Sequence, residues 1–139
     1  MIQEFTFDEL KVSQKASFKR KITKEDINLF CRITDDHHPL HTDSEYASKT
    51  KFKKPIVHGM YVNSLLSTLI GTYLPGKHAL VLSVSSQFVN PAYEDDTLAI
   101  EGIVKKKQEY GKVVEIDASI LNQDKVQVLV AKIKIQLRE

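Results

Sequence analysis

The stretch Gly59–Pro75 reads GMYVNSLLSTLIGTYLP, and it decides the architecture of this chain. Its first 16 residues, Gly59–Leu74, would form a helix about 24 Å long. Pro75-Gly76 then ends the helix, because proline cannot continue it. Such a helix is normally buried on most sides, since its apolar side chains do not fit one narrow stripe: Met60, Val62, Leu65, Leu66, Leu69, Ile70 and Leu74.

Downstream of this helix the apolar residues change to a period of two, which is typical of strands. We expect strands within residues 79–89, 98–104, 114–120 and 126–137, with short hairpin connections at Tyr110–Lys112 and Asn122–Asp124. In the last strand the apolar parity switches between Val130 and Ile133, which indicates either a stretch buried on two sides or a β-bulge. The chain therefore predicts an α+β fold, in which an antiparallel sheet wraps around a long central helix.

Upstream of the helix the signals are shorter. Alternation over about Gln14–Lys21 predicts an early strand. Thr23 is a candidate N-cap for a helix that ends near Thr34, and a second, short helix is expected over Ser44–Ala47. The first of these helices has an acidic first turn at Asp26 and an apolar face made of Ile27, Phe30 and Cys31.

Composition limits the possible function classes. The chain has 139 residues, a formal net charge of +2 and one cysteine. One cysteine excludes an internal disulfide framework and a multi-cysteine zinc site, and the small net charge does not indicate nucleic-acid binding. The N-terminus lacks the pattern of a signal peptide, and no apolar run is long enough to span a membrane. We expect a single domain over residues 1–139, located in the cytoplasm.

The densest polar cluster is DDHHPLHTD, residues 35–43, and His58-Gly59 follows at the start of the apolar helix. Such a cluster can be a solvated turn. However, Pro39 forces a bend on which Asp36 and His41 can converge, and a carboxylate beside an imidazole can move protons near neutral pH. The free amides at a helix start suit a carbonyl oxygen, and Gly59 lets one approach closely. No metal site is expected, because the spacing of the histidines and aspartates matches no standard zinc pattern. Cys31 is interpreted as a core residue and not as a nucleophile.

Three blocks in this order resemble the MaoC-like, R-specific enoyl-CoA hydratases of the hot-dog fold: DDHHPLHTD, KPIVHGMYVNSLLS and LPGKHALVLSVSSQFVNPAYEDDTL. The resemblance runs from about Ile33 to Thr97. It implies that Asp36 and His41 are the catalytic pair, that the Gly59 N–H binds the thioester carbonyl and that Ser67 supports the site. The residues expected to contact the substrate are His38, Val57, His58, Met60, Lys53 and Lys54.

His38 departs from the family pattern, which has asparagine at this position. In the family that asparagine helps to hold the active-site loop. A histidine can donate one hydrogen bond much as an amide does, so we expect the replacement to be tolerated.

The resemblance implies reversible syn addition of water to a trans-2-enoyl thioester, giving a 3R-hydroxyacyl thioester, without a cofactor. We favour His41 as base and Asp36 as acid. The lysines of segment 49–54 would meet the phosphates of CoA or the acidic surface of an acyl carrier protein. By the same resemblance two copies form a homodimer with one continuous sheet.

Two other functions are compatible with the same residues. A hot-dog thioesterase would use a carboxylate and water to cleave the thioester instead of hydrating the double bond. A non-catalytic module that binds acyl thioesters is the other alternative, and its main support is the replacement at His38.

Overall fold

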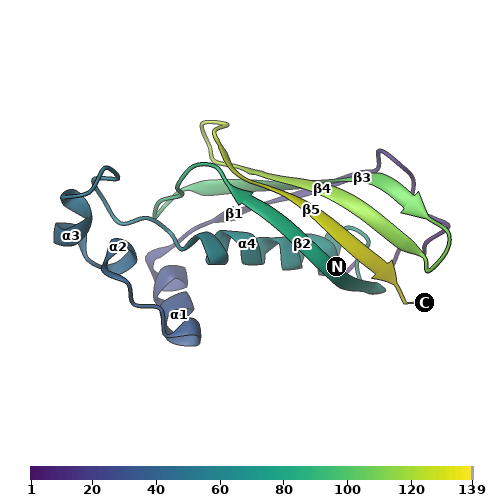
Figure 1. Cartoon of the computed structure of the whole chain (residues 1–139), viewed down its shortest axis with the longest axis horizontal. Helices are drawn as coiled ribbons and strands as arrows, with labels where there is room; N and C mark the ends of the chain where they lie inside the picture. The colour runs from purple at the N-terminus through teal and green to yellow at the C-terminus, as the bar shows by residue number, and fades with distance from the viewer. Residues whose placement is uncertain (139) are drawn as a thin grey trace.

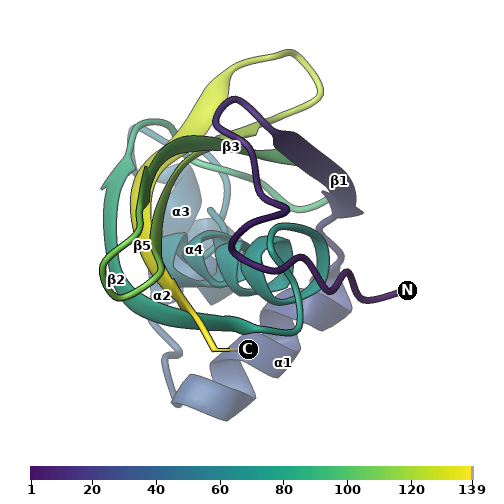
Figure 2. The same ribbon diagram turned by 90° about the vertical axis from the view of Figure 1, so that its right-hand side faces the viewer.

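The computed structural model describes residues 1–138, in which one face of a curved sheet covers a long helix (Figure 1). The helix is α4 (Gly59–Thr68), and it continues as one π-helical segment, η1 (Leu69–Tyr73). Figure 2 shows the sheet curling around α4 from the end of the molecule. The expected α+β fold is confirmed, and the helix ends one residue before the predicted Leu74.

The sheet has five antiparallel strands in the order β1-β3-β4-β5-β2. The strands are β1 (Lys15–Lys21), β2 (Ala79–Phe88), β3 (Thr97–Gln108), β4 (Val113–Leu121) and β5 (Gln127–Leu137). Both predicted hairpin connections are present, between β3 and β4 and between β4 and β5. Gly102 on β3 gives α4 and its extension room to pack, because a Cβ there would lie 2.9 Å from Leu69 Cδ2.

Strand β5 contains a β-bulge, but it lies at Val128 and not between Val130 and Ile133, where the sequence predicted the change of parity. Ile120 pairs with Leu129 and Leu121 pairs with Gln127, so Val128 is the extra residue. Val128 and Leu129 are both buried, after which every second residue up to Leu137 faces the core. Val126 is exposed and Val130 is only partly buried, so of the first predicted apolar run only Val128 is fully buried.

The α4 helix is less enclosed than its sequence predicts. Its buried residues recur at spacings of three and four and continue from Val62 into η1 at Ile70. On the opposite side Met60 is 61% exposed, and Ser64 and Ser67 are exposed as well. The expectation that the helix is buried on most sides is therefore wrong for the single chain, because the sheet covers only one side of it.

Three helices precede α4 in the chain: α1 (Lys24–Thr34), α2 (Pro39–Thr42) and α3 (Ser44–Ser48). In Figure 1 α1 lies below the start of α4, and the short helices α2 and α3 lie beyond the end of the sheet. Thr23 is the N-cap of α1, as expected. The structure adds a reciprocal bond, because the Thr23 and Asp26 side chains each accept the other residue's backbone N–H. Ile27 and Cys31 are buried, as their place on the apolar face predicted. These helices and their connections carry the polar cluster of residues 35–43.

Strand β2 lies at one edge of the sheet, and its apolar side chains are largely exposed. They include Leu80, Val81, Leu82, Val84 and Phe88. No helix in the described residues 1–138 has the length and hydropathy needed to cross a membrane.

Candidate functional site

Asp36 lies in the turn after α1, with its carboxylate held by a neighbouring amide. The helix ends at Thr34, and its C-cap Asp35 has a left-handed backbone. The Asp36 N–H donates to Thr34 Oγ1 at 3.2 Å. The His38 N–H donates to Asp36 Oδ1 at 3.2 Å. This bond, aided by the nearby imidazoles, lowers the pKa of Asp36 below its ordinary value. Asp36 is therefore ionised at neutral pH.

His41 is positioned by the single turn of α2. Pro39 occupies the first position of this turn, where its missing N–H costs nothing, and His38 is the N-cap. The His41 N–H donates to the His38 carbonyl at 2.9 Å. The His41 Nδ1 atom lies 2.8 Å from the Ile56 carbonyl oxygen. Because a carbonyl only accepts, Nδ1 carries the hydrogen, and Nε2 of the neutral ring keeps a free lone pair.

His58 contacts both His41 and Asp36 from the buried side of the site. Its ring is only 2% exposed and stacks on His41, with centroids 4.0 Å apart. Its Nε2 lies 3.2 Å from the Asp36 carbonyl oxygen and 3.7 Å from Cys31 Sγ. Burial lowers the pKa of His58, so the ring stays neutral and donates to the Asp36 backbone. His58 was expected to contact the substrate; its burial instead makes it a support for both predicted catalytic residues.

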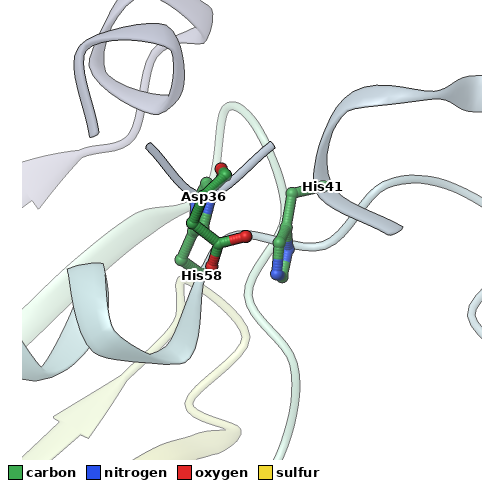
Figure 3. Close-up of side chains that lie close together, drawn as sticks. All are labelled: Asp36, His41 and His58. Atoms are coloured by element: carbon green, nitrogen blue, oxygen red, sulfur yellow. Dashed lines mark hydrogen bonds between the residues drawn. The ribbon is translucent and has the colours of Figure 1, made fainter. Parts of the chain in front are cut away.

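The three side chains meet in one place (Figure 3). A carboxylate oxygen of Asp36 and one ring nitrogen each of His41 and His58 lie within 4.8 Å of one another. Two hydrogen bonds of about 2.8 Å meeting at a water oxygen span about 4.6 Å, so Asp36 and His41 can share one water molecule. The arrangement can thus hold a water between a carboxylate and an imidazole.

The same three residues are the set that could hold a metal ion. An imidazole binds a metal in the plane of its own ring, through a nitrogen lone pair. The planes of His41 and His58 are stacked at an angle of 28°, so their lone pairs run side by side and do not converge. The geometry therefore favours water handling over metal binding.

Gly59 begins α4 directly after His58 and lines a cleft of about 600 Å³. As the first helical residue, it has an amide without a partner inside the helix. A Cβ at Gly59 would lie 2.9 Å from Phe88 Cδ1, so a larger residue would collide with this wall of the cleft. Other lining residues include Phe52, Ile56, Val57, Val62 and Tyr93. The cleft is largely apolar and includes the start of α4 in its lining.

The remaining predicted site residues are more scattered. Ser67 is exposed about 12 Å further along α4 than Gly59. Within the described residues it makes no hydrogen bond to Asp36 or His41, so its supporting role stays a prediction. Met60 points away from the core, and the exposed Lys53 and Lys54 lie in the loop after α3, with Lys54 Nζ 4.5 Å from the Tyr93 ring centroid.

Val57 lies in the wall of the cleft, and its predicted contact with the substrate stays a prediction. Three other features of the site were not predicted from the sequence. Val57 is buried in the cleft wall, and its N–H donates to the Ala92 carbonyl at 2.8 Å. The Ile56 carbonyl that orients His41, the Phe88 ring beside Gly59 and the contact of Cys31 with His58 were not predicted. A backbone carbonyl and an edge phenylalanine leave no sequence signal, whereas Cys31 could have been considered as a neighbour of the polar cluster.

Comparisons with known proteins show what the whole chain is similar to. A family model described as MaoC-like domain matches residues 7–125. An (R)-specific enoyl-CoA hydratase of Aeromonas caviae is 34% identical over 82% of this chain and 85% of its own length. An (R)-specific enoyl-CoA hydratase of Rhodospirillum rubrum is 35% identical over 73% of this chain and 74% of its own. The solved structure of R-hydratase PhaJ1 from Pseudomonas aeruginosa has a TM-score of 0.93 and 33% identity, covering 99% of this chain and 88% of that one.

Proposed function

The chain belongs to the MaoC-like domain family, and from this premise we propose that it is a hydro-lyase acting on acyl thioesters. The reaction is the addition of water to a trans-2-enoyl thioester, which gives a 3R-hydroxyacyl thioester, or the reverse dehydration. The observation that carries this proposal is the grouping of Asp36 and His41 at the start of α4. Such a site brings together a water-binding pair and an amide donor for a thioester oxygen.

Each group has a task in the addition. The Gly59 amide and the positive end of α4 stabilise negative charge on the thioester carbonyl oxygen. His41 Nε2 takes a proton from the shared water while the water oxygen bonds to C3. The electrons of the C2–C3 double bond move toward the carbonyl oxygen. When they return, C2 takes up a proton from the same face, and the adduct is neutral.

Asp36 orients the water in this scheme. We expected Asp36 to act as the acid, but its lowered pKa leaves no proton on it in the resting protein. An ionised carboxylate accepts a hydrogen bond from the water and points the water lone pair at C3. The proton that reaches C2 is then the one that His41 took. Because His41 both takes the proton from the water and delivers it to C2, the oxygen and the hydrogen add to the same face of the double bond.

The substrate is an acyl-CoA or an acyl carrier protein thioester. The acyl-pantetheine arm would lie in the cleft of about 600 Å³ beside Gly59, which Lys51 also lines. Lys53 and Lys54 follow in the same exposed loop, where they would meet phosphates or an acidic partner surface. Asp36 and His41 lie beside the cleft and not in its lining, so the thioester must pass over Gly59 to reach them.

A second copy of the chain completes the site in our proposal. Strand β2 (ALVLSVSSQF) contains no charged residue, although edge strands are usually protected by charges. Antiparallel pairing of two β2 edges would cover their exposed apolar side chains and continue the sheet. It would also cover the side of the cleft formed by Phe88 and Val89, which lie at the end of this edge.

The direct test follows the enoyl absorbance of crotonyl-CoA together with the release of free thiol. A hydratase lowers the absorbance without thiol release and forms the 3R product. Asp36→Asn should lower the rate about 100-fold, because the water loses the carboxylate that orients it. The matched neighbour variant Asp35→Asn should keep the rate, because Asp35 lies on the surface and its left-handed backbone also tolerates asparagine. Thiol release at unchanged enoyl content would identify a thioesterase, and binding without turnover would identify a non-catalytic module.

A further inference from the structure

His38 connects the two predicted catalytic residues by hydrogen bonds. Its backbone N–H donates to Asp36 Oδ1 at 3.2 Å, and its carbonyl accepts the His41 N–H at 2.9 Å. Its side chain caps α2, with Nδ1 accepting the Leu40 N–H at 3.1 Å. The capped turn is therefore the frame in which Asp36 and His41 are held.

The direction of the side-chain bond matters. We expected His38 to replace the family's asparagine as a donor, but in the structure its Nδ1 is an acceptor. An asparagine side-chain oxygen can accept at any ordinary pH, which is one reason why asparagine is a common N-cap. An imidazole nitrogen accepts only while it carries no proton. Imidazoles generally change charge between about pH 5 and 8.

Several titratable groups surround this cap. The His38 ring centroid lies 6.0 Å from that of His41 and 6.1 Å from that of Tyr46. Asp36 and His37 precede it in the same turn, Asp43 caps the next helix, and His58 stacks behind His41. Of these groups, none replaces the acceptor at the Leu40 amide, so protonation of Nδ1 leaves that amide to solvent.

We propose that His38 is a positioning residue whose neutral imidazole caps α2, and that its protonation releases the turn and misplaces Asp36 and His41. Loss of the cap lets the single turn of α2 fray, because a helix start depends on side chains for its amide partners. Hydration then slows at acidic pH for a reason separate from protonation of the catalytic pair itself. The kinetic part of this inference rests on the proposed function, whereas the structural part does not.

The structural test compares wild type, His38→Asn and His38→Ala in denaturant unfolding at pH 8 and pH 5.5. Both variants remove the imidazole, but only asparagine keeps a cap at both pH values. Wild type should match His38→Asn at pH 8 and His38→Ala at pH 5.5, with a gap of about fivefold in the unfolding equilibrium constant. Titration of other groups is common to all three proteins at each pH. If the stability of wild type stood in the same order relative to the two variants at pH 8 and at pH 5.5, the proposal would be overturned.

The kinetic test measures kcat/KM for crotonyl-CoA against pH. On the acid side of the profile, the decrease of kcat/KM should depend on one proton fewer in His38→Asn than in wild type. His38→Ala should be slower than His38→Asn at pH 8. The control His37→Asn removes an exposed imidazole that pairs with Asp35 at 3.2 Å and caps nothing, so it should keep the wild-type slope. If the acid side of the pH profile had the same slope for His38→Asn and wild type, the kinetic role of His38 would be refuted. If all four proteins were inactive, the proposed function would be refuted, but the result of the unfolding experiment would still stand.

Discussion

The imidazole rings of His41 and His58 lie face to face, with centroids 4.0 Å apart and planes inclined by 28°. His58 is buried and His41 is half-buried, so the inner ring supports the outer one. Because the inner ring also donates to the Asp36 backbone, it locates both members of the predicted catalytic pair. The stack also keeps the ring of His41 in the orientation that the Ile56 carbonyl requires.

Replacing His41 should remove the base without unfolding the protein. We expect His41→Ala to lower kcat for crotonyl-CoA by about 100- to 10,000-fold, the usual contribution of a general base. His37→Ala is the matched control, since this exposed histidine lies in the same turn and faces solvent. Equal rates for the two variants, measured at the enoyl absorbance, would remove His41 from the mechanism.

Gly59→Ala should collide with Phe88. The added Cβ would lie 2.9 Å from Phe88 Cδ1, and overpacking of this kind costs about 1–3 kcal/mol of unfolding free energy. It should also raise KM, because the methyl group enters the cleft. The double variant Gly59→Ala/Phe88→Ala should recover the stability. Gly71→Ala is the control, since a Cβ there meets no atom within 4 Å; a comparable loss in that variant would argue against the collision.

Burial of neutral His58 should make stability fall in acid. Its pKa in the folded protein is lowered, mainly by burial, so below about pH 6.5 the unfolded chain binds a proton that the folded chain does not. The free energy of unfolding should be largest above this pH and decrease as the pH drops through the folded pKa. His58→Phe keeps a ring but cannot titrate, so urea unfolding at pH 7.5 and 5.5 should show a smaller loss than wild type. His37→Phe should retain the full loss.

Strand β2 should hold two copies together. We expect light scattering to give twice the chain mass of 15.8 kDa at micromolar concentration. Val84→Lys, which places a charge on the exposed edge, should give monomers and reduce activity because the cleft loses its cover. Tyr110→Lys alters an exposed aromatic residue on the β3–β4 connection and should leave the mass unchanged. A wild-type monomer would contradict the dimer.

Chelation should leave the reaction unaffected. The lone pairs of the stacked histidines do not converge on one point, and the addition needs only protons and an amide donor. We therefore expect the same rate for crotonyl-CoA before and after dialysis against EDTA. A rate that disappears with EDTA and returns with one divalent cation would make Asp36, His41 and His58 a metal site.

Much of the fold follows from local sequence. Helix starts and ends depend on near neighbours, as in the pairing of Thr23 with Asp26, and the period of two marks strands wherever one face is buried. The spacing of Asp36, Pro39 and His41 likewise predicts a bend that brings a carboxylate near an imidazole. These are interactions within a few residues, so the sequence was sufficient to predict them.

Tertiary structure alone decided how the polar groups are used. The Ile56 carbonyl, which sets the tautomer of His41, lies 15 residues away along the chain, and Phe88 reaches Gly59 from strand β2. Packing decides which atoms come within about 3 Å of each side chain. It therefore decides whether His58 faces the substrate or the core, and whether the His38 side chain donates or accepts a hydrogen bond. The sequence by itself thus determined the residues of the site and the kind of fold. Packing decided burial, direction of hydrogen bonds and exposure of the β2 edge, because these depend on contacts between segments far apart in the chain.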